Sequence, residues 1–113
     1  MTDVLSSSES DAMIFLCNLA DIPEDEGLKV EIDGHEPIAV FQVDDEVYAI
    51  DDLCTHGLAS LAEGMLDGHA IECPFHSGTF DIRTGEALTF PCTIAVRAHK
   101  VHVEDGRVFL LPA

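Results

Sequence analysis

The sequence predicts a single all-β domain. Turn signals recur roughly every eight to twelve residues, and the segments between them are short, which is typical of antiparallel sheets. Several of these segments alternate apolar and polar side chains, the pattern of a strand with one buried face. Helical periodicity is scarce, since only residues 59–63 suit one helical turn. The 113 residues suffice for one compact domain with a modest core.

The first half of the chain is predicted to form one strand followed by a three-stranded meander. The strand segments are apolar or alternating, and Asp-Gly or Asp-Asp pairs between them favour tight turns. The expected elements are, in order, a strand at 13–19, a loop at 20–27, and strands at 28–32, 38–43 and 47–50, with turns at Asp33-Gly34 and Asp44-Asp45.

The second half is predicted to hold an insertion with two long loops, followed by closing strands. The first loop runs from Asp51 to about Gly64, and the second begins at Cys73. The expected strands are, in order, 65–66 and 70–72 around the Asp67-Gly68 hairpin, 80–82 before the Thr84-Gly85 turn, and 93–96, 99–103 and 107–111.

Each of the two loops carries one cysteine and one histidine. The first reads Cys54-Thr55-His56, and the second, after sixteen further residues (57–72), reads Cys73-Pro74-Phe75-His76. This mixed spacing is typical of a Rieske [2Fe-2S] centre, in which two His replace two Cys on one of the two irons. The candidate ligands are therefore Cys54 and Cys73 on one iron, and His56 and His76 on the other.

The chemistry of the cluster favours such a set. Two ferric ions, two sulfides and two thiolates sum to zero charge, whereas four thiolates would add two negative charges. An electron enters a neutral cluster more easily, so His ligation raises the reduction potential to roughly −150 to +300 mV. The alternative is a structural Cys2His2 zinc site, since zinc also takes thiolate and imidazole. Common zinc motifs pair Cys with Cys and His with His, whereas each loop here mixes them.

The composition is strongly acidic. There are 22 Asp and Glu residues against 5 Lys and Arg, a net charge of −17. This disfavours binding to nucleic acid or an anionic membrane and favours a basic protein partner. Acidity that serves solubility alone is the alternative. No apolar run approaches the roughly 18 residues of a membrane span.

Residues 1–11 contain no Lys or Arg and no apolar segment, so we expect a short disordered arm rather than a secretory signal. The expected location is the cytoplasm. The two cysteines outside the motif, Cys17 and Cys92, are expected to be buried thiols in a reducing compartment, with a disulfide between them as the alternative.

The motifs resemble those of the Rieske ferredoxins of bacterial aromatic-ring-hydroxylating dioxygenase systems. The resemblance covers most of the chain from about Met13 and is strongest at residues 54–57, 73–81 and 84–87. It implies an all-β, Rieske-type antiparallel β-sandwich of one domain (1–113), with a small inserted cluster-binding subdomain at about 52–90. It also implies one [2Fe-2S] cluster per chain, with His56 and His76 near the surface at one tip and Pro91 in a third loop beside the cluster.

The resemblance implies a one-electron carrier rather than an enzyme. A flavin-containing NAD(P)H-dependent ferredoxin reductase would supply the electron, and the terminal Rieske oxygenase would receive it. A monomer suits such a shuttle. The alternatives are a zinc-binding or structural Rieske-like interaction module, and a catalytic oxygenase, for which the chain is too short to add a mononuclear iron domain.

The chain departs from the respiratory and photosynthetic Rieske proteins at four positions. Those proteins have a disulfide-forming Cys where Ala59 and Phe75 stand here, and Ser and Tyr hydroxyls where Gly78 and Phe80 stand. Fewer donors to the sulfurs stabilise the reduced cluster less. The sequence therefore predicts a potential at the low end of the range, roughly −150 mV.

Other polar residues near or outside the motif are expected to have structural roles. Asp51 and Asp52, just before Cys54, are interpreted as a solvated turn, with part of a docking face as the alternative. His35, His69, His99 and His102 match no ligand position and are expected to be surface or strand histidines.

Overall fold

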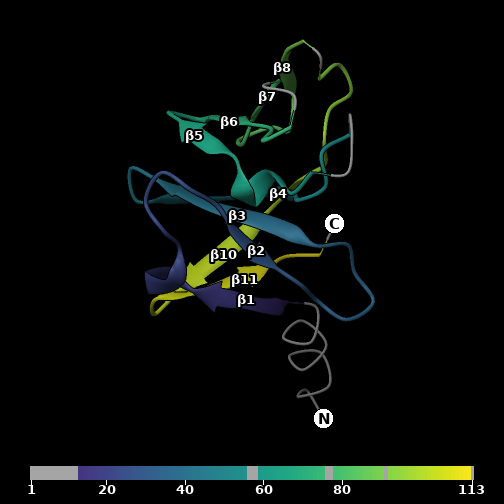
Figure 1. Cartoon of the computed structure of the whole chain (residues 1–113). Coiled ribbons are helices and arrows are strands. Elements are labelled where there is room, and N and C mark those ends of the chain that lie inside the picture. Colours follow the sequence, from purple (N-terminus) through teal and green to yellow (C-terminus); the bar gives the residue numbers. More distant parts are fainter. Residues whose placement is uncertain (1–12, 56–58, 76–77, 91, 113) are drawn as a thin grey trace.

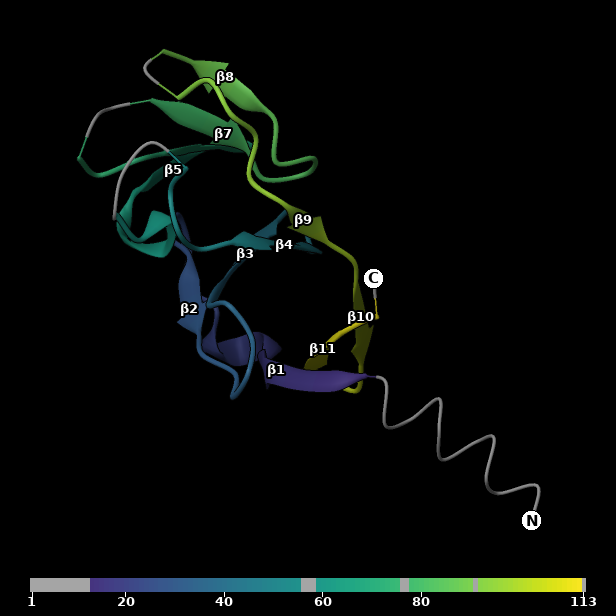
Figure 2. The same cartoon turned by 90° about the vertical axis from the view of Figure 1, so that its right-hand side faces the viewer.

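The computed structural model describes residues 13–55, 59–75, 78–90 and 92–112. These residues form antiparallel strands in three sheets, two short 3-10 helices and no α-helix, which confirms the all-β prediction. The sheets stack as three layers (Figures 1 and 2). None of the helices in the described part of the chain is long and apolar enough to cross a bilayer. The predicted arm, residues 1–11, lies outside the described residues.

The central sheet contains the predicted meander. Its strand order is β2-β3-β4-β9, and Asp44 and Asp45 both adopt positive φ angles, 52° and 69°, in the turn that joins β3 to β4. Two successive positive angles give the turn a twist that matches the paired strands. The strands are β2 (Leu28–Val30), β3 (Ile38–Val43), β4 (Glu46–Asp51) and β9 (Ala98–His99).

Both faces of β3 are buried, which explains its continuous apolar sequence. Ile38 and Val40 point to one side, and Ala39 and Phe41 to the other, because side chains alternate along a strand. All four are fully buried. The central sheet is therefore covered on both sides. The sheet β1-β11-β10, here called the base sheet, covers one face, and the sheet β5-β6-β7-β8, the tip sheet, covers the other.

The base sheet has the order β1-β11-β10 and pairs the two ends of the described chain. Its core side chains, Leu16, Val108 and Leu110, pack against Ile38 and Val40 of the central sheet. The strands are β1 (Ile14–Asn18), β10 (Val101–Glu104) and β11 (Arg107–Leu110), and a 3-10 helix η1 (Leu19–Asp21) follows β1. This layer and the central sheet form the sandwich.

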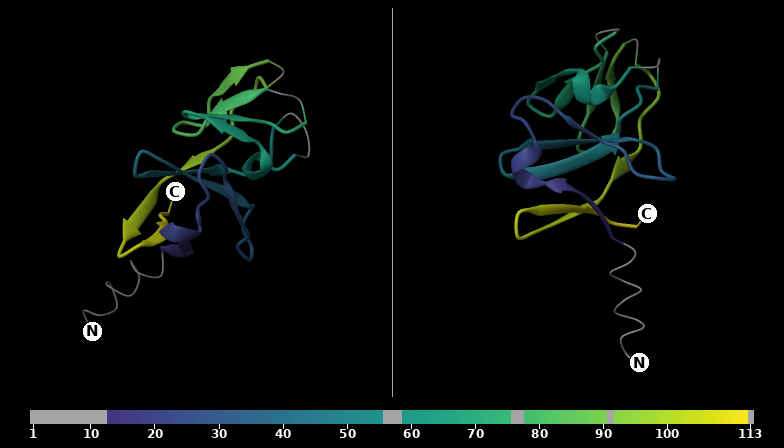
Figure 3. Two further views of the ribbon diagram at one scale, coloured as in Figure 1. Left: turned by 60° about the vertical axis from the view of Figure 1, so that its left-hand side comes forward. Right: turned by 60° about the horizontal axis from the view of Figure 1, so that its bottom comes forward.

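The tip sheet is the insertion, with the order β5-β6-β7-β8. Leu61, Ile71 and Phe80 pack against Phe41 on the face of the central sheet opposite the base sheet. Figure 3 shows the green β7 and β8 on the opposite side of the molecule from the yellow β10 and β11. The elements are η2 (Leu61–Glu63), β5 (Met65–Asp67), β6 (Ala70–Glu72), β7 (Thr79–Asp81) and β8 (Ala87–Thr89).

Two sequence predictions about the later strands are wrong. Residues 93–96 form no strand, because the Val96 N–H donates instead to Gly85 O (2.9 Å) and ties this segment to the turn after β7. The single strand expected at 99–103 is divided at Lys100. Its first part, β9, pairs with β4 of the central sheet, whereas β10 pairs with β11 of the base sheet. Strand β8 was not predicted.

Candidate metal centre

Each candidate ligand loop is closed by a backbone hydrogen bond from its cysteine. The Cys54 N–H donates to Ala59 O (3.0 Å), and the Cys73 N–H donates to Gly78 O (2.8 Å). The first loop leaves the central sheet after β4, and the second joins β6 to β7 of the tip sheet. The predicted histidine ligands, His56 and His76, lie outside the described residues.

The carboxylate of Asp52 adds further hydrogen bonds across the base of the first loop. Its Oδ1 accepts hydrogen bonds from Ser60 Oγ and from the backbone N–H of Ala62, both at 2.9 Å. The Asp52 backbone carbonyl also accepts from the Leu61 N–H (2.7 Å). Asp52 is only 3% exposed. The interpretation of this residue as part of a solvated turn is therefore wrong: it is a buried anchor that holds the two ends of the loop together.

Cys54 and Cys73 both lie in the apolar layer between the central sheet and the tip sheet. They are 2% and 1% exposed, and they belong to the same core cluster as Phe41 and Phe80. Cysteine sulfurs are soft metal ligands, and this layer keeps them away from water. The donor set thus fits a metal centre that takes soft sulfur ligands and is shielded from water.

Cys92 is a third cysteine in this layer, and the sequence analysis did not assign it to the metal centre. The Sγ of Cys92 lies 4.0 Å from that of Cys54, and both side chains are buried. Burial, then the neighbouring Cys54, and to a smaller extent Cys73, raise the pKa of the Cys92 thiol to about 12. The sequence did contain a signal for this position, because Cys92 directly follows Pro91, and the family resemblance assigns Pro91 to a third loop beside the cluster. Pro91 itself lies outside the described residues.

The fourth cysteine, Cys17, lies on the other side of the central sheet. It belongs to the core between the base and central sheets, whereas Cys92 belongs to the core beneath the tip sheet. Burial and the nearby Asp21 raise the pKa of the Cys17 thiol to about 11. None of the four cysteines, all of them described, forms a disulfide. The expectation of buried thiols is confirmed, and the disulfide alternative is wrong.

The positions that distinguish the chain from respiratory Rieske proteins lie around the two thiols. Ala59 and Phe80 are buried in the same core, and neither carries a polar atom on its side chain. Phe75 is 68% exposed. A Cβ added to Gly78 would collide with the Sγ of Cys92, so the glycine leaves room for that side chain.

No group of three or more His, Cys, Asp and Glu side chains suited to a metal ion occurs within residues 13–55, 59–75, 78–90 and 92–112. Both histidines of the predicted ligand set fall in the gaps between these ranges. The fit of the site to a metal cluster therefore rests on the thiol pair and on the closed loops that carry it.

The remaining histidines contact a carboxylate, a backbone carbonyl or an aromatic ring. His99 Nε2 lies 2.7 Å from Asp51 Oδ1, and Arg97 Nε lies 3.6 Å from the second carboxylate oxygen. Asp51 thus joins β4 to β9 and to Arg97 just before it, and it does not belong to a solvated turn. The other contacts pair His35 with the Glu36 carbonyl, His69 with the Tyr48 ring and His102 with Glu104.

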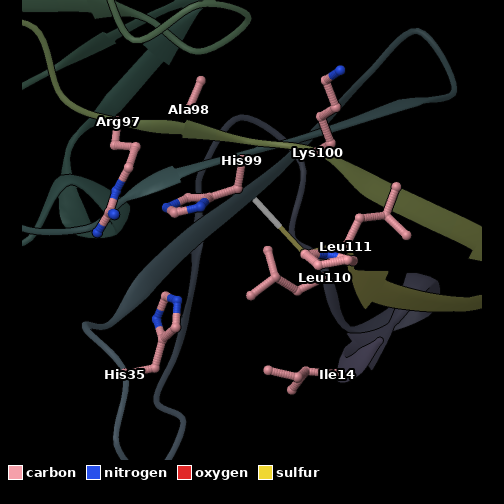
Figure 4. Close-up of a pocket in the computed structure, with 9 residues that line it drawn as sticks. Ile14, His35, Arg97, Ala98, His99, Lys100, Leu110 and Leu111 are labelled. Carbon is pink, nitrogen blue, oxygen red and sulfur yellow. The ribbon is translucent and has the colours of Figure 1, made fainter. Parts of the chain in front are cut away.

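A pocket of about 460 Å³ lies beside β9 and the end of β11 (Figure 4). Its basic lining residues are His35, Arg97, His99 and Lys100, and the Asp51 carboxylate pairs with two of them. No cysteine lines this pocket. It is separate from the thiol pair of the candidate centre.

Comparison with known proteins gives the family. Residues 12–100 match the model of the Rieske [2Fe-2S] domain. The chain is 40% identical over 111 residues to the ferredoxin component of a p-cumate 2,3-dioxygenase system from Pseudomonas putida, covering 97% of this chain and 94% of the relative. The zinc alternative is thereby replaced by a [2Fe-2S] cluster.

Solved structures of ferredoxins are similar to this chain as well. A ferredoxin of Sphingomonas yanoikuyae B1 superposes with a TM-score of 0.85 at 44% identity, covering 88% of this chain and 98% of that one. A second match is the ferredoxin in a complex of reduced oxygenase and oxidised ferredoxin of carbazole 1,9a-dioxygenase. It superposes with a TM-score of 0.82 at 41% identity, covering 88% of this chain and 93% of that one. The chain therefore belongs to the Rieske [2Fe-2S] domain family, and it is a [2Fe-2S] electron carrier rather than an enzyme.

Proposed function

We propose that Cys54 and Cys73 bind one iron of the cluster and that His56 and His76 bind the other. Three observations support this ligand set: the spacing of the four residues, the closed loops that begin at each cysteine, and the burial of both thiols in one layer. All four positions lie within the range that matches the family model, residues 12–100. We further propose that residues 52–90 form the cluster-binding subdomain of a single domain, since they contain both loops and the whole tip sheet.

The carrier would serve the terminal oxygenase of an aromatic-ring-hydroxylating dioxygenase system. The cluster, when bound, accepts and releases one electron without making or breaking a covalent bond. A flavin-containing NAD(P)H-dependent reductase would supply the electron, and the reaction would take place in the cytoplasm with the carrier as a monomer. The p-cumate relative and the carbazole oxygenase–ferredoxin complex support this assignment.

An exposed apolar patch next to the ligand loops would form the docking surface. Phe75 lies two residues after Cys73 and is 68% exposed, while Phe90 and Ile94 are 84% and 66% exposed. The Thr55 hydroxyl donates to Ile94 O (2.6 Å), which fixes the segment of Ile94 against the loop of Cys54. Exposed aromatic and aliphatic side chains are typical of interaction surfaces.

The net charge of the chain would affect docking to its partners, and the burial of the two thiols would affect the surroundings of the cluster. A net charge of −17 would steer the carrier toward a basic surface on its partners and would keep two carriers apart. Burial of the thiols keeps water from the sulfur side of the centre. With apolar Phe80 and Gly78 in place of hydroxyl donors, the potential is expected to be low, about −150 mV.

The observation that carries this function is the pair of buried thiols, each at the start of a closed loop. The test is anaerobic mixing of the reduced protein with the oxidised oxygenase component of a p-cumate dioxygenase system. Reoxidation of the carrier in step with reduction of the oxygenase, followed by absorbance in a stopped-flow instrument, is expected. A reduced carrier that stays reduced with this and other aromatic-ring oxygenases would contradict the proposal.

A further inference from the structure

The segment after β8 places a third sulfur beside a proposed ligand. The Cys92 N–H donates to Thr89 O (3.1 Å), which makes a tight turn at the end of β8. This turn holds the Cys92 Sγ 4.0 Å from the Cys54 Sγ, in the interior of the protein and 38 residues away in the sequence. The two sulfurs are thus within hydrogen-bond distance of each other and shielded from solvent.

The second ligand loop is shaped around the same side chain. Gly78 lacks the Cβ that would collide with the Cys92 Sγ and also approach the Cys92 backbone N to 2.9 Å. The carbonyl of Gly78 in turn accepts the hydrogen bond that closes the loop of Cys73. The Cys92 side chain therefore lies between Cys54 of one loop and Gly78 of the other.

We propose that the Cys92 thiol donates a hydrogen bond to the Cys54 sulfur and thereby makes the cluster easier to reduce. Cys92 is then a positioning and tuning residue of the centre. This inference rests on the proposed ligand set. As an iron ligand, Cys54 is a thiolate without a proton, so only Cys92 can be the donor.

The direction of the effect follows from charge. Reduction adds one electron to the cluster and its sulfurs, and a donor aimed at a ligand sulfur stabilises that added charge. Gly78 and Phe80 have no hydroxyl to offer, so the Cys92 thiol partly replaces the donors that the sequence lacks. A thiol is a weak donor and the S···S distance is long, so the expected effect is modest.

The test uses the cluster-containing full chain and three substitutions. Cys92→Ala removes the donor without adding an atom beside Gly78, Cys92→Val removes it and fills the space with carbon, and Cys92→Ser keeps a donor. At a fixed ambient potential, the ratio of reduced to oxidised cluster should fall about threefold to tenfold in the Ala and Val variants, and tenfold equals about 59 mV for one electron. The Ser variant should stay at or above wild type.

A second measurement distinguishes a hydrogen bond from Cys92 from an effect of its packing alone. Pulsed EPR of the reduced protein in H2O and D2O should show an exchangeable proton coupling that is lost in Cys92→Val and kept in Cys92→Ser. Ala and Val variants with the potential and the proton coupling of wild type would overturn the inference, as would failure of all three variants to hold the cluster. Cys17→Ala, in the other core, should leave both readouts unchanged.

The wild-type spectrum distinguishes this inference from the function itself. A wild-type cluster with the EPR signal of four-cysteine ligation would make Cys92 a ligand and overturn the proposed ligand set together with the inference. A His-ligated signal with an unshifted potential in the variants would overturn the inference and leave the function standing.

Discussion

The carboxylate of Asp52 accepts a hydrogen bond from Ser60 Oγ at 2.9 Å, across the base of the loop that contains Cys54. The same oxygen accepts from the Ala62 N–H, so one buried carboxylate joins the strand before the loop to the 3-10 helix after it. The position of the Cys54 thiol depends on this closure, because the loop has only a few residues between its anchors.

Replacing Asp52 by Ala should destabilise the protein and loosen the cluster. The substitution leaves the buried Ala62 N–H and the Ser60 hydroxyl without their acceptor, which costs about 2 to 3 kcal/mol. Thermal unfolding and the rate of bleaching of the visible spectrum measure the two effects. Glu63→Gln removes a carboxylate from the same helix at an exposed position and should match wild type. Equal bleaching rates for the two variants would show that Asp52 does not support the centre.

Removing a proposed cysteine ligand should abolish cluster binding, whereas removing a cysteine elsewhere should not. Cys73→Ala takes away one of two thiolates from one iron, so iron and acid-labile sulfide should fall to background. Cys17→Ala is the matched control, because it also removes a buried thiol, from the core on the other side of the central sheet. That control should keep full iron content and lose about 1 kcal/mol of stability. Full iron content in Cys73→Ala would disprove the ligand set.

The apolar patch should control the rate of electron delivery without affecting the cluster. Phe90→Ser removes the most exposed of its side chains, so the second-order rate constant for reduction of the oxygenase should fall about tenfold, with potential and absorption unchanged. This corresponds to about 1.4 kcal/mol of lost docking energy. Val103→Ser, on β10 of the base sheet and 41% exposed, is the control. If both variants react at the wild-type rate, docking takes place on another surface.

The ion pair between Asp81 and Arg83 gives a stability that depends on pH. Asp81 accepts hydrogen bonds from the Arg83 backbone N–H (2.8 Å), Nε (3.0 Å) and Nη2 (2.9 Å). These bonds, led by those of the side chain, hold the pKa of the Asp81 carboxyl below its ordinary value of 3.8. A depressed pKa in the folded state means that the pair stabilises the fold above the ordinary pKa and loses that contribution as the pH falls through the folded value.

Asp81→Asn should therefore be less stable than wild type at pH 7, by on the order of 1 kcal/mol because Arg83 is half exposed. The difference should shrink on acidification below about pH 4, as followed by circular dichroism melts of both proteins at each pH. Glu31→Gln breaks an exposed pair with Lys29 and should leave stability unchanged at every pH. A constant gap between Asp81→Asn and wild type from pH 7 to pH 3 would refute the pH dependence.

The part of the fold that depends on local pattern could be predicted from the sequence. Alternation and turn residues located the meander of β2 to β4 and the β5–β6 hairpin, and they located β1 and β11 to within a residue or two. The spacing of the two Cys-x-His and Cys-x-x-His loops identified the kind of centre. Each of these signals lies within a short stretch of chain.

The features that depend on distant partners could not be predicted. Residues 93–96 are apolar and look like a strand, but Val96 bonds to the turn at Gly85 instead of to a neighbouring strand. Asp52 was interpreted as solvated because carboxylates are mostly exposed, whereas its partners bury it. Cys92 meets Cys54 only because the chain after β8 returns to the first ligand loop, and no short-range pattern encodes that return.

The most direct test of the account is the EPR spectrum of the purified wild-type protein after reduction with dithionite. Ligation by Cys54, Cys73, His56 and His76 predicts a [2Fe-2S] signal with the low average g value that two histidine ligands produce, from a protein that contains two irons and two sulfides per chain. A signal with the higher average g value of a four-cysteine cluster would contradict the proposed ligand set and the mechanism built on it.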